Sequence, residues 1–203
     1  MTISNFKDDI PGDIDWGQAV AIDTETMGLN NHRDRLCVVQ LSSGDGNAII
    51  VQIAADPAPA PNLVALLANP DIVKLFHFGR FDMAILSKTY GTMPAPIYCT
   101  KIASKLARTY TDRHGLKELC RELLSVDLSK QQQSSDWGKE TLSKEQKAYA
   151  ASDVLYLHQL RDRLDDMLQR EGRQELAQQS HDFLATRVML DLRGWNEMDI
   201  FSH

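Results

Sequence analysis

Acidic residues at three separate places in the 203-residue chain could together bind a divalent cation. Asp23 and Glu25 follow directly on an apolar run, and an extended strand would point both side chains to the same face. Asp82 follows a second apolar run, and Asp153 stands four residues after Tyr149. Neighbouring carboxylates repel each other, and hard cations such as Mg²⁺ offset that repulsion by binding carboxylate oxygens.

Each of these acids also has an ordinary structural explanation. An acid pair can lie on a solvated strand face, and an acid in the first turns of a helix, as predicted for Asp82, complements the helix dipole. Tyr149 and Asp153 share one helical face, which an apolar stripe continues through Leu157, Leu160, Leu164 and Met167. A lone aspartate on this stripe could be held by hydrogen bonds. Without hydrogen bonds or a bound metal, its burial would be energetically costly. The three motifs together favour the metal site.

Strands and helices must bring these acids together. Short β-prone runs are predicted at residues 18–22, 36–41, 48–51 and 72–76. Helical patterns are predicted at residues 62–68 and 79–89 and over most of the chain from Thr100 onward. The longest predicted helix runs from Ser143 to about Gln169, with a capping box formed by Ser143 and Gln146. Strands first, with helices interspersed and then dominating, predict an α/β domain with a mixed sheet.

Composition limits the class of protein. The chain is 43% apolar and 25% charged, which is typical of a globular domain, and no apolar run approaches the roughly 20 residues of a membrane-spanning helix. Residues 1–12 lack the apolar stretch of a secretory signal. Three cysteines without Cys-x-x-Cys spacing fit a reducing compartment, so we expect a cytoplasmic protein without membrane partners.

Charge is distributed unevenly. The 22 basic and 28 acidic residues give a net charge of −6, which argues against a broad basic surface that coats long nucleic acid. Residues 99–121 nevertheless hold six basic residues against two acidic ones, a local sum of +4. Such a cluster is commonly a solvated helix face, and it gains meaning only beside a catalytic site.

The three acidic motifs resemble a known enzyme family. Asp23-x-Glu25, Phe81-Asp82 and Tyr149-x-x-x-Asp153, in this order, resemble the exonuclease motifs of the DEDDy subgroup of 3′-5′ exonucleases, in its ribonuclease D branch. The resemblance covers about residues 18–170. The sequence of residues 35–41 is most similar to that of the nano-RNase C subfamily.

Two positions depart from the family pattern. Phe78 stands after His77 where the family usually has asparagine, so a polar contact to substrate is missing. Gly138 and the two residues after it stand where the ribonuclease D pattern commonly has Arg-Pro.

The resemblance implies a ribonuclease H-like fold and a two-metal site for Mg²⁺ or Mn²⁺. It implies one exonuclease domain over residues 1–203, with the motifs in residues 18–170 and a C-terminal helix and tail in residues 171–203. By the same resemblance, Asp23, Glu25 and Asp153 hold the metal that activates water. Asp23 bridges to the second metal, which Asp82 supports through water. The Tyr149 hydroxyl would orient the attacking water.

Further residues are candidates for substrate binding. Main-chain groups from Thr24 to Thr26 are expected to bind the 3′-terminal ribose, and Leu29 to act as a wedge between bases or else to pack under the strand. His77 is expected either to contact substrate or to serve the structure. The candidates for the 5′ phosphate are Lys101, Lys105, Arg108, Arg113 and His114. The aromatic residues that could stack bases or fill the core are Trp16, Trp137 and Tyr110.

The sequence therefore predicts a metal-dependent 3′-5′ exoribonuclease that acts on short single-stranded RNA. Three alternatives stay open: ribonuclease D-like trimming of RNA 3′ ends, a DNA exonuclease, and a non-catalytic nucleic-acid-binding module. Apolar and aromatic residues in the C-terminal tail favour a homo-oligomer, and the subfamily resemblance implies an octamer.

Overall fold

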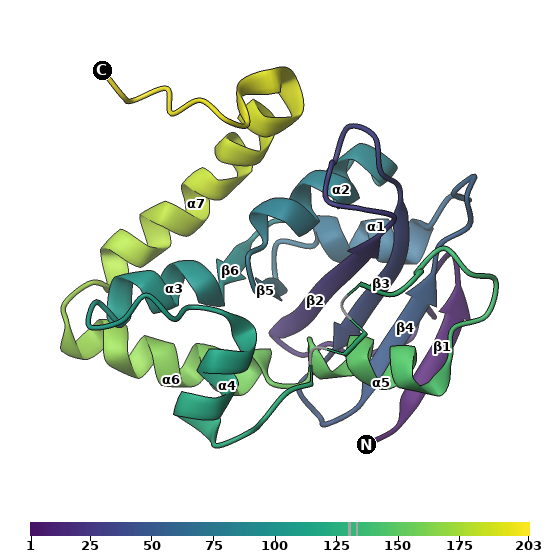
Figure 1. Cartoon of the computed structure of the whole chain (residues 1–203), viewed down its shortest axis with the longest axis horizontal. Coiled ribbons are helices and arrows are strands. Elements are labelled where there is room, and N and C mark those ends of the chain that lie inside the picture. The colour runs from purple at the N-terminus through teal and green to yellow at the C-terminus, as the bar shows by residue number, and fades with distance from the viewer. Residues whose placement is uncertain (130, 133) are drawn as a thin grey trace.

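A mixed six-stranded sheet forms the centre of the computed structural model, which describes residues 1–129, 131–132 and 134–203 (Figure 1). The strands are β1 (Ile3–Lys7), β2 (Ala19–Thr26), β3 (Leu36–Ser42), β4 (Ala48–Gln52), β5 (Val73–Phe76) and β6 (Ile97–Cys99). Their order in the sheet is β1-β4-β3-β2-β5-β6. The pairs β2–β3 and β3–β4 are antiparallel, and the other neighbours are parallel. The predicted α/β class with a mixed sheet is confirmed.

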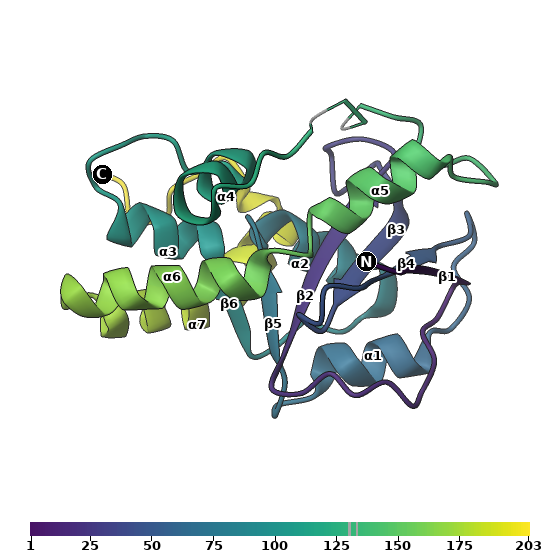
Figure 2. The ribbon, with the colours of Figure 1, turned by 90° about the horizontal axis from the view of Figure 1, so that it is seen from below.

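Helices cover both faces of this sheet. They are α1 (Pro61–Ala68), α2 (Arg80–Tyr90), α3 (Thr100–Ala107), α4 (Leu116–Leu124), α5 (Lys144–Ser152), α6 (Leu157–Arg170) and α7 (Gln174–Leu190), followed by the π-helical turn η1 (Asp191–Trp195). Figure 2 shows α1 on one side of the sheet and α5 and α6 on the other. Over the described part of the chain, no helix is both long and apolar enough to cross a membrane.

Side chains along β2 point alternately to the two faces of the sheet. Val20 and Ile22 belong to the core that includes α1 and α2, whereas Ala19 and Ala21 belong to the core under α3, α4 and α6. The same period of two continues to the end of the strand. Asp23 therefore follows the alanines toward the α5–α6 side.

The acidic residues lie where β2 extends beyond the end of its neighbour β5. The parallel partner β5 pairs with β2 only from Ala19 to Ala21. Beyond that point β2 continues through Asp23 and Glu25, paired with β3 alone. The edge left open at the end of β5 is where the first turns of α2 approach β2.

The predicted helix from Ser143 to about Gln169 is wrong as a single element. The chain forms α5 and α6 instead, separated at residues 153–156. Ser152 Oγ donates a hydrogen bond to the Tyr149 carbonyl at 2.7 Å, and the backbone N–H groups of Val154 and Leu155 both bond to the Ala151 carbonyl. A hydroxyl that bonds back to the helix competes with the regular ladder and favours such a break.

Other local expectations had mixed outcomes. The capping box is present, because Ser143 Oγ accepts from the Gln146 N–H and the Gln146 side chain accepts from the Ser143 N–H. The strand predicted at residues 18–22 extends through Glu25, which is the condition for Asp23 and Glu25 to share a face. The sequence analysis missed β1 and β6, which have five and three residues and little periodicity to detect.

Candidate active site

Three carboxylates from β2 and the end of α5 meet at one point. One oxygen atom from each of Asp23, Glu25 and Asp153 can be chosen so that all lie within 4.8 Å of one another. Asp23 and Glu25 reach this point because they alternate onto one face of β2. Asp153 reaches it because α5 ends at Ser152 and the chain turns there. This is the arrangement that the spacing of the acids predicted.

Asp82 approaches the same cluster from α2. Its side chain is buried, and its Oδ1 accepts a 2.6 Å hydrogen bond from Thr24 Oγ1. Thr24 therefore fixes the orientation of Asp82, a contact that the sequence analysis did not predict. The side chain of Thr26 is also engaged, because its Oγ1 donates to the Gly28 carbonyl at 2.5 Å.

Burial raises the pKa of every acid in the cluster, and repulsion from neighbouring carboxylates adds to this rise at Asp23, Glu25 and Asp153. Burial is the largest cause in each case, and it raises the pKa of Asp82 and of Asp153 to about 7. The pKa of Glu25 rises to about 9 through burial and then through Asp153 and Asp82, and that of Asp23 rises well above its usual value. Charge of this density needs a counter-charge, and an all-carboxylate donor set suits Mg²⁺ or Mn²⁺.

Tyr149 lies beside the cluster with its hydroxyl protonated. Burial and the charges of Asp153, Glu25 and Asp23 raise the pKa of the phenol above its ordinary value. The hydroxyl in turn lowers the pKa of Asp153. A phenol in this state can orient a water molecule by hydrogen bonding, but it cannot act as the formal base near neutral pH.

Two residues at the site escaped the sequence analysis. Gln40 lies opposite Asp23 in the β2–β3 ladder, and its Nε2 donates to Asp23 Oδ2 at 3.4 Å. Its signal was a polar residue inside the apolar run of residues 36–41. Lys117, at the start of α4, lines the cleft together with the four acids. Only its membership of the basic segment pointed to it.

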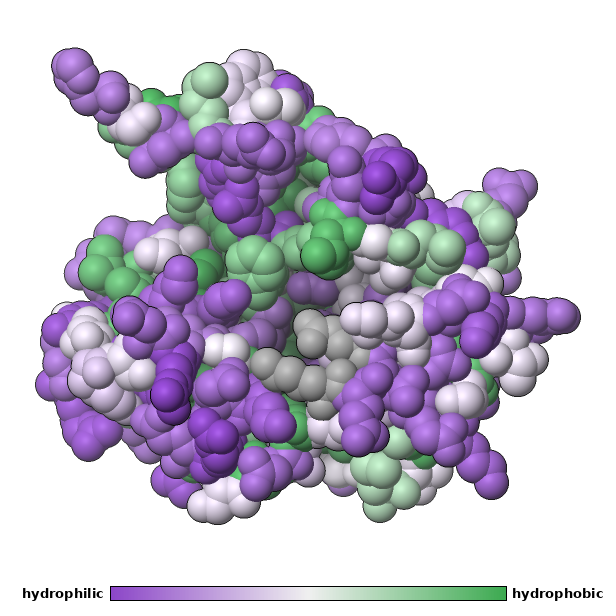
Figure 3. Space-filling view, viewed as in Figure 1, coloured by the Kyte–Doolittle hydropathy of each residue, from purple (hydrophilic) through white to green (hydrophobic). Residues whose placement is uncertain are grey.

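The acids line a cleft of about 360 Å³. Leu29, His77, Phe78 and Phe81 also line this cleft. Figure 3 shows the corresponding face as largely hydrophilic, with hydrophobic surface gathered around its middle and beneath the C-terminal region. The apolar part of this lining suits flat bases, and the carboxylates suit divalent cations, which can in turn bind phosphate.

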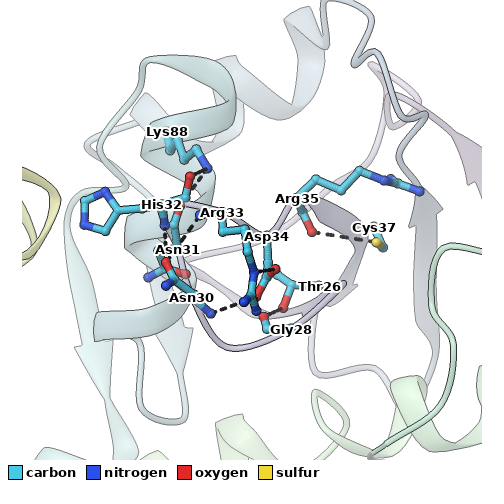
Figure 4. A network of polar contacts seen from close by, with 10 residues as sticks. All are labelled: Thr26, Gly28, Asn30, Asn31, His32, Arg33, Asp34, Arg35, Cys37 and Lys88. Carbon is cyan, nitrogen blue, oxygen red and sulfur yellow. Dashed lines mark hydrogen bonds and ion pairs between the residues drawn. The ribbon is translucent and has the colours of Figure 1, made fainter.

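Leu29 projects from a loop that is firmly anchored. Its side chain is 89% exposed, so the expectation that it packs under the strand is wrong. Asp34 accepts from the Asn30 N–H at 3.0 Å and from Arg33 at 2.7 and 2.9 Å, and Lys88 binds two loop carbonyls (Figure 4). These bonds lower the pKa of Asp34 to about 2. Gly28 is also required, because a Cβ there would lie 2.4 Å from an Asp34 oxygen.

His77 has a structural contact and also lines the cleft. It lines the cleft, and its Nδ1 lies 2.9 Å from Thr100 Oγ1. Burial and the neighbouring Lys101 lower its pKa to about 3, so the ring is neutral at physiological pH. A neutral imidazole held on one nitrogen leaves the other for a further hydrogen bond.

The prediction that Arg108 faces the 5′ phosphate is wrong. Its side chain is fully buried and forms an ion pair with Glu122. The guanidinium also donates to Ser104 Oγ at 3.0 Å and to the Arg113 carbonyl at 2.8 Å. It is thus occupied in tying the loop of residues 108–115 to α3 and α4.

The other residues predicted to contact the 5′ phosphate lie in different surroundings. Lys105 and Arg113 are exposed, and His114 Nδ1 lies 2.9 Å from Ser104 Oγ. Lys101 holds its ammonium 4.2 Å from the centre of the Phe78 ring, at the edge of the cleft. Of the aromatic candidates, Trp16 and Trp137 are buried in the core and Tyr110 is exposed.

Comparison with known proteins decides the family. Residues 8–169 match the sequence family described as 3′-5′ exonuclease. The chain belongs to this exonuclease family. It is thus an enzyme, a hydrolase that removes nucleotides from 3′ ends.

Individual relatives agree with this assignment. Brucella melitensis NrnC, solved with bound Mg²⁺, is 59% identical over 100% of both chains, with a TM-score of 0.96. Escherichia coli RNase D is 25% identical over 84% of this exonuclease and 45% of that chain, with a TM-score of 0.76. Ribonuclease D of Granulibacter bethesdensis is 37% identical over 76% of this chain. That match spans only 38% of the ribonuclease D.

Proposed function

We propose that this exonuclease hydrolyses short oligoribonucleotides from the 3′ end to nucleoside 5′-monophosphates. The observation that carries the proposal is the meeting of Asp23, Glu25, Asp82 and Asp153 beside Tyr149 in one cleft. Support for a short substrate comes from NrnC of Brucella melitensis, which was solved bound to pGG and is 60% identical over the full chain.

The four carboxylates fit two divalent cations. Asp23, Glu25 and Asp153 would hold one ion, Asp23 would also reach the second, and Asp82 would support the second through water. When bound, such ions acidify a water molecule and neutralise charge at the scissile phosphate. The protein holds one of these ligands in position before any ion binds, because Thr24 fixes Asp82 through a hydrogen bond of 2.6 Å.

The remaining residues would position the substrate. The Tyr149 hydroxyl, held protonated, would orient the attacking water. Lys117, His77 and the main chain from Thr24 to Thr26 surround the place where the terminal nucleotide would lie. Leu29 would insert between the last two bases from its anchored loop.

A product ladder tests this function. RNAs of two, five and twenty nucleotides with a 5′ label, and matched DNAs, are incubated with Mg²⁺ or Mn²⁺. We expect stepwise shortening from the 3′ end, with the dinucleotide cleaved at least as efficiently as the longest RNA. Asp23→Ala serves as the inactive control, and its turnover at the wild-type rate would overturn the metal assignment.

A second candidate function is trimming of RNA 3′ ends. The ribonuclease D relatives, at 36–38% identity over 76% of the chain, favour it specifically. In the same assay this function would leave dinucleotides as accumulating end products. Equal cleavage of the matched DNAs would extend the substrate class to DNA.

We also propose that the protein forms a homo-oligomer, with an octamer as the expected state. The basis is a set of exposed apolar side chains, here called the C-terminal apolar surface: Leu176, Phe183, Met189, Trp195, Met198, Ile200 and Phe201. Apolar surface gathered in this way is typical of contacts between proteins. A symmetric ring would cover it in every subunit.

A further inference from the structure

Phe78 stands at the border between the active-site cleft and a second pocket. The second pocket has a volume of about 340 Å³ and shares Leu29, Phe78 and Phe81 with the cleft. Its other walls come from the loop after β2, from Arg80 and from the η1 region. A chain that enters the cleft with its 3′ end can therefore continue into the second pocket past Phe78.

The backbone at Phe78 adopts a conformation that phenylalanine rarely takes. Its φ is 68°, in the left-handed region, which is strained for a bulky residue. Asparagine tolerates this region better than phenylalanine does. The next residue must be glycine, because a Cβ on Gly79 would lie 2.7 Å from Phe76 Cβ. The turn that aims the ring is thus fixed on both sides.

The ring of Phe78 is nevertheless open to a ligand. It is 45% exposed, which for a residue with strained backbone argues against a role in core packing. Lys101 places its ammonium 4.2 Å from the ring centre, a cation–π contact that holds one side of the ring. Leu29, from its anchored loop, lines the same two pockets. An exposed aromatic face at this border suits a nucleic-acid base.

We propose that Phe78 determines specificity by stacking against the base of the nucleotide that precedes the 3′-terminal one. This inference rests on the proposed function. The terminal base lies in the cleft with the acids, and the preceding base lies in the second pocket against Phe78. An aromatic face contributes to binding only when a base lies against it, so binding depends on the presence of a second base.

Kinetics of Phe78 variants on matched dinucleotides test this role. Phe78→Leu removes the aromatic face, and Phe78→Tyr keeps it. We expect Phe78→Leu to raise KM for a diribonucleotide at least about fivefold, the lower end of what one base–aromatic stack contributes, with a smaller change in kcat. Phe78→Tyr is expected to stay within about twofold of wild type. Phe6→Leu, on β1 at the far edge of the sheet, is the matched control.

Substrates that lack one base show which nucleotide is involved. One analogue has an abasic residue at its 5′ position and the other at its 3′ position. The effect of Phe78→Leu on KM should vanish with the first analogue and persist with the second. An equal effect on both analogues, or an unchanged KM for the intact dinucleotide, would overturn the assignment. Failure of the wild-type enzyme to hydrolyse any of them would instead reject the proposed function.

Phe78→Asn separates stacking from stability. Asparagine relieves the backbone cost, so the melting temperature should stay the same or rise while KM for the dinucleotide rises. A fall in melting temperature with unchanged KM would show that Phe78 serves the fold.

Discussion

The carboxylates of the cleft repel one another until a cation is bound. A change at Asp153 can measure this repulsion. Asp153→Asn keeps the shape of the side chain and removes one charge. We expect the rate to fall at least about a thousandfold, since a lost ligand removes several kcal/mol of transition-state stabilisation. The metal-free melting temperature at pH 8 should rise, because Asp23 and Glu25 lose a repelling neighbour. Differential scanning fluorimetry beside the rate assay checks both; a variant that loses activity and also unfolds would contradict this account.

Tyr149 is expected to orient the attacking water rather than bind metal, so its replacement should affect the rate and leave metal binding in place. Tyr149→Phe removes the hydroxyl while leaving all four carboxylates in place. We expect kcat to fall about a hundredfold, a typical contribution of one positioned hydrogen-bonding group. Calorimetric titration with Mn²⁺ should show metal affinity close to wild type. Loss of metal binding in this variant would mean that Tyr149 acts by holding Asp153 in place.

At the scale of elements, the loop of residues 108–115 depends on a buried guanidinium. Arg108→Met removes the guanidinium that donates to Ser104 Oγ and to the Arg113 carbonyl, and a hydrogen bond that involves a charged group contributes about 1.5–3 kcal/mol. We expect the free energy of unfolding in urea to fall by about 2–4 kcal/mol. Arg113→Met, at an exposed side chain, is the control and should change it by less than about 0.5 kcal/mol. Equal effects of both variants would show that the buried contacts contribute little.

The elements also show what the sequence could predict. Period-two alternation placed Asp23 and Glu25 on one face, and an i, i+4 spacing placed Asp153 near Tyr149. The break after Ser152 was not predictable, because neither glycine nor proline marks it and the bond from the Ser152 hydroxyl to the Tyr149 carbonyl leaves no signal in the sequence. Arg108 was assigned to phosphate because charge indicates exposure in a sequence. Its burial depends on Glu122, which belongs to another helix.

At the scale of the whole molecule, metal and protons should compete. The folded pKa values of about 7 for Asp82 and Asp153 and about 9 for Glu25 lie above the values near 4 of an unfolded chain. The folded state therefore holds these protons more tightly, a stabilisation that is complete below about pH 4 and is lost as pH rises through 7 to 9. We expect the metal-free melting temperature to fall from pH 6 to pH 9.

Added Mg²⁺ should raise the melting temperature more at pH 9 than at pH 6, because the ion binds deprotonated carboxylates. Asp153→Asn should weaken this difference. A metal-induced shift that is equal at both pH values would contradict the assignment of these acids as ligands.

Self-association tests the C-terminal apolar surface. Phe201 is 76% exposed and lies beside Phe183, which is 40% exposed, with ring centres 6.0 Å apart, so both rings are available to a second copy. Light scattering after size exclusion should give a mass near eight times 22.8 kDa. A double change, Ile200→Glu with Phe201→Glu, should lower that mass because each charge must be desolvated in a contact. Met27→Glu, at a 54% exposed apolar residue outside this surface, should leave the mass unchanged. A wild-type mass near 23 kDa at micromolar concentration would show that this surface has no role in self-association.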